Sequence, residues 1–252
     1  MQITITQGRI DHYKLIRHGL EKHGITVYES DTPRTKVVTC WGWRRGKELR
    51  DRGHDVLVFE RAYLGDRFYY TSIGWNGLNG HADFSLKGDE KTKGEWNLEK
   101  WRDGEYIVIM GQVSGDASLQ GKNLTQRYEE WAQQASEIYN MPVYFKPHPN
   151  TARGNFKPKI ETIGGDLSGV LEKCHLALCY NSNSSVDAVI NGVPCVTFDR
   201  GSMAYEVTSH SIYNRIMPDR EGWLARVSNC QWTPEEIKNG DYVERMLCGL
   251  ES

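Results

Sequence analysis

Small polar side chains gather in residues 181–185, which read Asn-Ser-Asn-Ser-Ser. An apolar run, 176–180, precedes them, and the pattern that follows predicts a helix over 184–191 that ends at Gly192. The first N–H groups of a helix have no partner inside it, so this turn could bind a phosphate. Side chains that would add to such a site are Asn181, Ser182, Ser184 and Ser185. The alternative is that these residues only cap the helix.

A second segment, 143–150, reads Val-Tyr-Phe-Lys-Pro-His-Pro-Asn and is a short apolar strand that ends in Lys146 and His148. In open α/β sheets, ligands bind beyond the carboxyl ends of the strands, so both side chains would face the same crevice as 181–185. The two prolines fix the backbone around His148, and a cation beside an imidazole donor suits a diphosphate. The alternative is a rigid loop that leaves an edge strand.

Three segments, taken in order, resemble a known family. They are residues 107–116 (Ile-Val-Ile-Met-Gly-Gln-Val-Ser-Gly-Asp), the Lys-Pro-His-Pro segment, and the Asn-Ser-Asn-Ser-Ser turn followed by Asn-Gly-Val-Pro. Together they resemble the C-terminal half of GT-B glycosyltransferases of the capsule-polysaccharide type, which includes the Kdo transferases. Small phage-encoded glycosyltransferases are similar too. The likeness covers roughly residues 105–210 as an ordered set of motifs and is weaker over 1–100.

The resemblance implies that the two halves of the chain bind different substrates. The C-terminal half would hold a nucleotide-sugar donor, the N-terminal half would hold most of the acceptor, and the chemistry would take place in the cleft between them. It also implies a donor contact for Glu206, which lies where GT-B enzymes commonly place an acidic residue. Gln112 and Ser114, in the turn after the strand at 106–111, are further donor candidates, although turn formation alone would explain them.

Sugar transfer to a hydroxyl needs stabilisation of the departing phosphate and, for inversion, a base that takes the acceptor proton. Lys146, His148 and residues 181–185, which we call the serine turn, would meet the first need. His148 is therefore a catalytic candidate. For the base we favour Glu60, because it ends a predicted strand just before the glycine- and aromatic-rich segment 61–80, which we expect to be a functional loop. Weaker candidates in that region are Asp66 and Asp83. Glu60 could instead be a surface carboxylate paired with a neighbouring arginine, and a retaining reaction would need no such base.

Aromatic and basic residues alternate over 41–79, a composition that suits stacking on a sugar or on a flipped base. The acceptor candidates are Trp41, Trp43, Arg44, Arg45 and Trp75. The favoured acceptor is a 5-hydroxymethylated pyrimidine in phage DNA, and the alternative is a surface polysaccharide or glycolipid. Many of these aromatics could also pack in the core.

Donor chemistry and two other functional classes remain open. UDP or CMP is favoured as the donor nucleotide. The chain has no Asp-X-Asp motif, so we expect no obligatory metal and no other cofactor. A nucleotide-sugar 2-epimerase would use a similar fold and serine turn without any acceptor. A non-catalytic nucleotide or nucleic-acid binding module would use the turn for binding alone.

Composition limits the class of protein. The net charge of −2 gives no overall basic field, although one basic face would suffice for nucleic acid. The six cysteines form no C-x-x-C pair and are expected to be core residues in a reducing compartment. No apolar run is long enough to span a membrane, and the N-terminus lacks a signal-peptide pattern. These features predict a cytoplasmic protein, in the host cytoplasm if it is phage-encoded, and leave its oligomeric state open.

Strands and helices alternate along the chain, which predicts an α/β fold. Expected strands are 2–6, 25–29, 36–40, 56–60, 106–111, 143–146, 176–180 and 195–198, with a short element at 160–163; expected helices are 10–22, 44–52, 125–139, 167–173 and 184–191. We expect two compact, Rossmann-like, GT-B-like halves with parallel sheets that face a cleft. Residues 1–102 would form the acceptor half, and 103–252 the donor half with a C-terminal helix after Thr233. The polar segment 87–102 would link them.

Overall fold

The computed structural model describes residues 1–6, 10–150, 154 and 156–247. Contacts divide the chain into two units, which we call unit 1 (Met1–Gly94 with Leu224–Ser252) and unit 2 (Glu95–Trp223). The sequence places the change of unit near residue 102 and assigns everything after it to the second half. The structure instead returns the segment from Leu224 onwards to unit 1.

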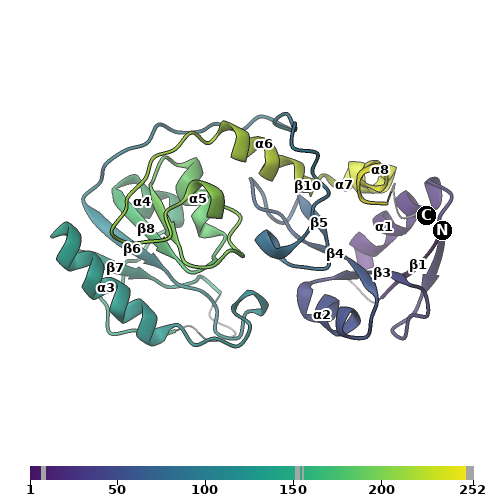
Figure 1. The fold of residues 1–252 in the computed structure, drawn as a ribbon, viewed down its shortest axis with the longest axis horizontal. Coiled ribbons are helices and arrows are strands. Elements are labelled where there is room, and N and C mark those ends of the chain that lie inside the picture. Colours follow the sequence, from purple (N-terminus) through teal and green to yellow (C-terminus); the bar gives the residue numbers. More distant parts are fainter. Residues whose placement is uncertain (7–9, 151–153, 155, 248–252) are drawn as a thin grey trace. The chain divides into compact units, whose positions relative to one another are not determined.

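Unit 1 contains a six-stranded sheet in the order β10-β5-β4-β3-β1-β2 (Figure 1). The strands are β1 Gln2–Ile5, β2 Thr26–Glu29, β3 Val37–Trp41, β4 Asp55–Arg61, β5 Thr71–Trp75 and β10 Gln231–Trp232. The first four are parallel, whereas β5 is antiparallel to β4, and β10 is antiparallel to β5. The expected all-parallel sheet is therefore wrong for this unit. The connection from β4 to β5 contains no crossover helix, and such a short connection leaves the next strand antiparallel.

The strand β5 lies inside the segment 61–80, which the sequence assigns to a functional loop. All five of its residues are buried. A Cβ on Gly74 would lie 2.8 Å from the Cβ of Ala82 and 3.0 Å from the ring of Phe84. Glycine at this position therefore permits close packing within a strand, and it does not mark a loop.

Helices cover both faces of the unit 1 sheet. Alternation along β4 sends Leu57 and Phe59 to one core cluster and Val56 and Val58 to another, the latter shared with Leu49. The first face packs against α1 Ile10–Lys22, α7 Pro234–Asn239 and α8 Asp241–Leu247, and the second against α2 Trp43–Asp51. The helices α1 and α2 agree with the predicted ranges within a residue.

The C-terminal helix is confirmed at its start but is divided into two. Thr233 caps α7 through a capping box with Glu236, and Pro234 occupies the first turn. The helix ends at Gly240, whose φ of 82° is left-handed, and α8 begins immediately afterwards. Neither β10 nor the helix α6 Glu221–Asn229 was predicted from the sequence.

Unit 2 contains a four-stranded, all-parallel sheet in the order β7-β6-β8-β9 (Figure 1). The strands are β6 Tyr106–Met110, β7 Val143–Lys146, β8 Cys174–Cys179 and β9 Cys195–Thr197; the helices are α3 Thr125–Tyr139, α4 Leu167–Glu172 and α5 Ser184–Ile190. Single 3₁₀ turns are η1 Asn79–His81 in unit 1, and η2 Ala117–Leu119 and η3 Tyr205–Val207 in unit 2. The predicted strands and helices of this half are confirmed, except that the element at 160–163 forms only a bridge between Phe145 and Thr162.

The unit 2 core lies between the sheet and α3. Ile107 and Ile109 of β6 pack with Tyr128 and Trp131 of α3. Trp131 in turn stacks on Phe198, with ring centroids 3.9 Å apart. This packing fixes the sheet from one side and leaves its carboxyl edge to the loops, where the polar residues lie.

Five cysteines in the described part of the chain are free and buried: Cys40, Cys174, Cys179, Cys195 and Cys230. Burial raises the pKa of Cys40 and of Cys174 to about 12, so these groups remain thiols at neutral pH and are poor nucleophiles. Cys248 lies outside the described residues. Among the helices of the described ranges, none is long and apolar enough to cross a membrane.

Gly192 and Gly121 provide a test of the unit 2 fold. Both have left-handed φ, +69° and +82°, but a Cβ on Gly192 would lie 2.1 Å from the carbonyl oxygen of Lys100, whereas Gly121 has nothing within 4 Å. We expect Gly121→Ala to lower the free energy of unfolding by about 1–2 kcal/mol, from φ alone. Gly192→Ala should lower it by about 1–3 kcal/mol more, because the backbone must shift. Urea unfolding measures both, and equal losses would contradict the close approach of residues 100 and 192.

Candidate functional site

The predicted donor residues lie at the carboxyl edge of the unit 2 sheet. The chain passes from β6 to β7 on one side, and then to β8 on the other side of β6. Ligands in open α/β sheets bind beyond the carboxyl ends of strands at such a reversal of strand order. The residues that follow or end the four strands there are Gln112, Lys146, Asn181 and Asp199.

Gln112 and Asn181 join the loops after β6 and β8 at this reversal point. The Asn181 Oδ1 accepts from Gln112 Nε2 at 2.8 Å, and the Asn181 backbone N–H donates to Gln112 Oε1 at 3.2 Å. The Asn181 Nδ2 also donates to the Ser118 carbonyl at 3.0 Å and to Asp199 Oδ1 at 3.1 Å, while Gln112 Nε2 reaches Ser118 Oγ at 3.3 Å.

This network corrects the predicted roles of the two amides. Both side chains are buried, and the NH₂ hydrogens of each are directed to protein acceptors. A ligand would have to break these bonds to reach them. Gln112 and Asn181 are therefore positioning residues that hold the loops, and direct donor contact is left to their neighbours.

The sequence missed Lys122 and the role of Asp199 in this network. The Asp199 carboxylate accepts from the Gly201 backbone N–H at 2.9 Å and from the Tyr180 hydroxyl at 3.0 Å. Lys122 Nζ donates to the same hydroxyl at 2.5 Å, and this hydrogen bond raises the pKa of Lys122. The lysine side chain is half exposed, so it adds a positive charge at the rim of the same edge.

The serine turn separates into an internal and an outer part. Ser185 is fully buried; its Oγ donates to the Ser182 carbonyl at 2.8 Å and lies 2.8 Å from Ser202 Oγ. This contradicts ligand contact for Ser185. Ser182 Oγ donates to Ser184 Oγ at 3.1 Å and accepts from the Ser184 N–H at 3.2 Å, and Ser184 is only half-buried. The first N–H groups of α5 already have acceptors in Ser182 Oγ and in the carbonyl oxygens of Ser182 and Asn183, so the candidate that remains is the Ser184 hydroxyl and not a free helix terminus.

Lys146 and His148 lie at the end of β7, beside β6. Lys146 Nζ donates to the Gly165 carbonyl at 2.7 Å. His148 Nδ1 accepts from the backbone N–H of Asn150 at 3.0 Å, so a neutral ring carries its proton on Nε2. The pair therefore supplies one cation and one N–H donor at the carboxyl edge of the sheet.

Two further donor candidates lie in loops of the same edge. Ser114 is exposed in the turn after β6, and its backbone N–H donates to the Gly154 carbonyl at 3.2 Å. Glu206 is exposed in η3, within the segment that follows β9. The topology therefore brings all the unit 2 candidates to one edge, although the buried ones have structural partners.

In unit 1, Glu60 lies near the carboxyl end of β4 and is half-buried. Its Oε1 accepts from the backbone N–H of Arg61 at 2.9 Å, and its Oε2 is 3.6 Å from where a Cβ would stand on Gly42. Gly42 precedes α2 and gives it no side-chain cap. A helix N-terminus favours a negatively charged neighbour, so this position suits a carboxylate.

The acceptor candidates occupy different environments. Trp75 is buried, and its Nε1 donates to the Met246 carbonyl at 2.9 Å, so it is a core residue and the predicted acceptor contact is wrong. Trp43 packs over Gly46, where a Cβ would lie 2.8 Å from the indole. Arg45 donates to Glu48 Oε2 at 2.9 Å and to the Asp31 carbonyl at 2.6 Å, whereas Arg44 is exposed.

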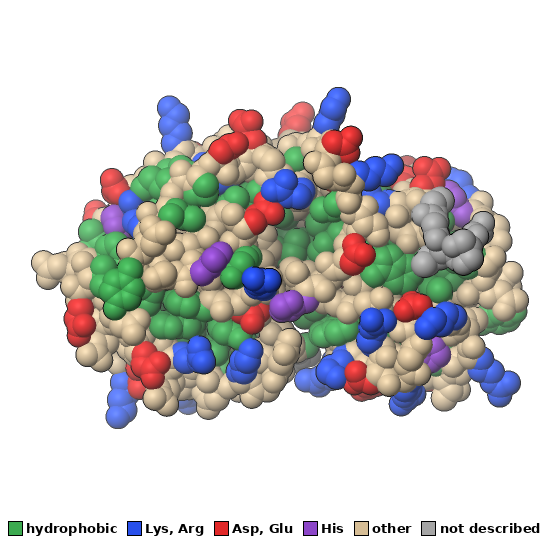
Figure 2. Space-filling model, viewed as in Figure 1, with side chains coloured by type: hydrophobic (Ala, Val, Ile, Leu, Met, Phe, Trp, Pro, Cys, Tyr) green, Lys and Arg blue, Asp and Glu red, His purple; other side chains and the backbone are tan. Residues whose placement is uncertain are grey.

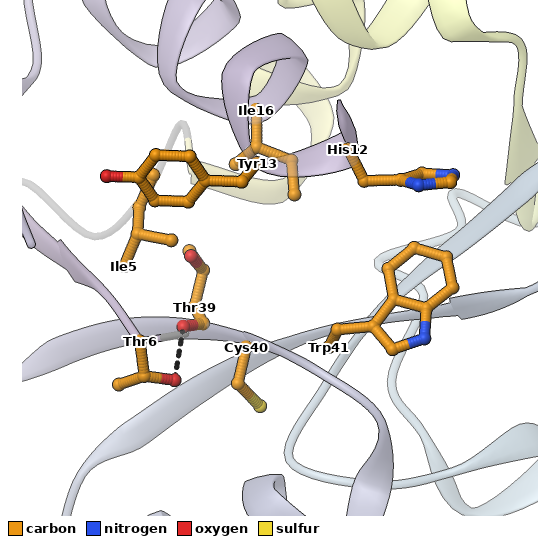
Figure 3. A pocket seen from close by; sticks show the side chains of 8 residues that line it. All are labelled: Ile5, Thr6, His12, Tyr13, Ile16, Thr39, Cys40 and Trp41. Carbon is orange, nitrogen blue, oxygen red and sulfur yellow. Dashed lines mark hydrogen bonds between the residues drawn. The ribbon is translucent and has the colours of Figure 1, made fainter. Parts of the chain in front are cut away.

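Trp41 is the acceptor candidate that borders a pocket. It is half-buried, and its indole lies against the imidazole of His12, with ring centroids 4.4 Å apart and planes at 53°. The pocket, shown in Figure 3, is lined by Ile5, Thr6, His12, Tyr13, Ile16, Thr39, Cys40 and Trp41. No functional role was predicted for His12, because a lone histidine in a helical pattern carries no spacing signal. Within the described residues, no group of three or more His, Cys, Asp or Glu side chains could hold a metal ion.

Comparison with known proteins finds similar structures without a similar sequence. No protein-family model and no curated protein matches the chain. The structure of the β-Kdo 2,7 transferase of Thermosulfurimonas dismutans KpsC aligns with all of this chain and covers all of that chain, with a TM-score of 0.61 and 14% identity. The β-Kdo 2,4 transferase of the same KpsC aligns with 88% of this chain and 89% of that chain, with a TM-score of 0.55 and 14% identity.

These likenesses show the fold. The chain shares the α/β architecture of the KpsC transferases, in keeping with the two Rossmann-like halves implied by the GT-B resemblance. A UDP-GlcNAc 2-epimerase from Methanocaldococcus jannaschii covers 99% of both chains, but its TM-score of 0.30 at 13% identity is too low to favour the epimerase alternative.

Asn181→Ala tests whether the amide network holds the donor edge. Removing the amide leaves Gln112 Nε2 without its 2.8 Å acceptor in a buried site, so we expect the free energy of unfolding to fall by about 1–3 kcal/mol. Ser114→Ala is the control, because an exposed serine in the neighbouring turn should change stability by less than about 0.5 kcal/mol. Urea unfolding followed by circular dichroism compares the two. If both variants unfold like the parent, the network does not stabilise the edge.

Proposed function

We propose that this protein is a glycosyltransferase that moves a sugar from a nucleotide-sugar donor to a hydroxyl group of a glycan. The observation that carries the proposal is the gathering of phosphate-binding groups at one edge of the unit 2 sheet, at its reversal of strand order. The fold shared with the KpsC Kdo transferases supports the same reading.

The donor phosphate would bind among Lys146, His148 and the start of α5. Lys146 supplies positive charge, His148 supplies an N–H donor on Nε2, and Ser184 adds a hydroxyl at the start of α5. Charge that develops on the leaving phosphate would be stabilised by these groups. The Gln112–Asn181 network holds the loop that leads into α5, and with it Ser184, before the donor arrives. With these groups neutralising the phosphate, the proposed site needs no metal.

Glu60 would act as the base on the acceptor side if the reaction inverts the anomeric centre. It lies beside the N-terminus of α2, which favours a negative charge, and the ionised form of a carboxylate is the one that accepts a proton. The acceptor hydroxyl would lose its proton to Glu60 as its oxygen attacks the sugar, while the phosphate leaves with the electrons of the broken bond.

We propose a polysaccharide or glycolipid acceptor in place of the DNA base favoured from the sequence. On the face shown in Figure 2, Lys and Arg side chains are interspersed with Asp and Glu. Binding to a DNA backbone draws on clustered cations, and the net charge of −2 adds no basic field. The structural neighbours are named as sugar transferases. The cytoplasmic location remains a prediction from the sequence.

Nucleotide binding is the first test. A ligand at about a hundred times its Kd stabilises a protein by about 2.7 kcal/mol, so UDP or CMP should raise the Tm by a few degrees, with GDP and ADP for comparison. Lys146→Ala should reduce the shift. Lys173→Ala is the matched control, because this lysine precedes β8 at the opposite edge of the same sheet. No shift with any of the four nucleotides would overturn the donor site.

Turnover tests the catalytic assignment. Glu60→Gln keeps the shape but removes the proton acceptor, so we expect kcat to fall by about 10²–10⁴ while the nucleotide-induced rise in Tm persists. Glu48→Gln, a carboxylate of α2 paired with Arg45, should retain full activity. The measurement is sugar transfer from the donor whose nucleotide gave the shift. Full activity of Glu60→Gln would remove this residue from the mechanism.

A further inference from the structure

The pocket in unit 1 lies where the strand order of that sheet reverses. The chain passes from β1 to β2 on one side, and then to β3 on the other side of β1. Thr6 follows β1 and joins it to β3, because its backbone N–H donates to the Thr39 carbonyl at 2.9 Å and its Oγ1 donates to the same oxygen at 3.2 Å (Figure 3). The pocket therefore occupies the position in unit 1 that favours a ligand.

Among the residues that the structure describes, two hydroxyl groups of the pocket have no hydrogen-bond partner. They are Thr39 Oγ1 and Tyr13 Oη, and both atoms are buried. Thr39 as a whole is 0% exposed. Figure 3 shows its side chain directed away from the sheet, towards α1 and the ring of Tyr13. Buried polar groups in folded proteins are nearly always paired, so we expect these two to take a partner from outside the described residues.

The rest of the lining limits what that partner can be. Ile5 and Ile16 give apolar walls, and the rings of His12 and Trp41, which contact each other at a tilt, close one end (Figure 3). No Lys, Arg, Asp or Glu is among the eight lining residues. A phosphate or carboxylate would lack a counter-charge there, whereas a neutral hydroxyl can both donate to and accept from Thr39 and Tyr13.

We propose that this pocket, which we call the Thr39 pocket, binds a hydroxyl-bearing edge of the acceptor sugar. Thr39 and Tyr13 would hydrogen-bond to the sugar, and the His12–Trp41 pair would pack against its ring. The pocket lies at the same sheet edge as Glu60, whose carboxylate is beside Gly42, the residue after Trp41. This inference rests on the proposed function and assigns the residues that select the acceptor.

A matched pair of variants tests the proposal. Thr39→Val and Thr71→Val each remove a buried hydroxyl that has no partner from a strand of the same sheet, but only Thr39 lines the pocket. Neither loss breaks a hydrogen bond within the described protein, so both variants should keep or raise the Tm. Tyr13→Phe extends the test to the second hydroxyl.

The readout is binding of methyl glycosides of glucose, galactose and Kdo, titrated by saturation-transfer NMR. We expect at least one glycoside to bind the parent protein, Thr39→Val to weaken that binding about tenfold, and Thr71→Val to leave it unchanged. Tyr13→Phe should weaken it as well.

Three results would overturn the proposal: no glycoside binds, Thr39→Val binds like Thr71→Val, or Thr39→Val alone loses stability with binding intact. The last result would mean that the pocket holds only an ordered water. The nucleotide-induced rise in Tm distinguishes these failures from failure of the proposed function. If the nucleotide binds but the two threonine variants bind glycosides equally, only the role of the Thr39 pocket is wrong.

Discussion

The hydrogen-bonded pair of Gln112 and Asn181 is the constraint on which the unit 2 site depends. It joins the loops after β6 and β8 at the reversal of strand order, where the backbone itself offers no pairing. Through Asn181 the pair also holds Asp199, after β9. A buried network of this kind is stable only when every member is satisfied, so it fixes one arrangement of three loops. Asn181 leads directly into α5, so the Ser184 hydroxyl at the start of that helix is held in place before any ligand binds.

Local sequence patterns predicted most of the elements, for physical reasons that differ between the units. In unit 2 each strand contains a short apolar run followed by polar residues, and α3 was predicted with its observed bounds, Thr125–Tyr139. In unit 1 the strand β5 was missed because Gly74 is a signal for a loop unless its neighbours are known. The strand β10 has two residues and exists only because β5 pairs with it, so no local pattern could reveal it.

The sequence predicted which edge of the sheet carries the candidate residues, but not which of their polar groups have partners within the protein. Strand topology brings the ends of β6, β7 and β8 to one edge, and that follows from alternation along the sequence. Which polar groups remain open there depends on partners far away in the chain. The Ser185 hydroxyl pairs with the hydroxyl of Ser202, and the Trp75 indole N–H donates to the Met246 carbonyl. Thr39 is the opposite case. It lies in a strand of mostly apolar residues, and only the packed structure reveals that its hydroxyl has no partner among the described residues.

The return of residues 224–252 to unit 1 has a consequence for the order of folding. The strand β10 and the helices α7 and α8 complete the sheet edge and one core face of unit 1, and they follow the whole of unit 2 in the chain. During synthesis the ribosome completes unit 2 before unit 1. Until β10, α7 and α8 are made, the apolar residues of β5 and α1 that pack against them remain exposed to solvent. Nascent chains of this protein should therefore be most prone to aggregation while the segment before β10 is still being made.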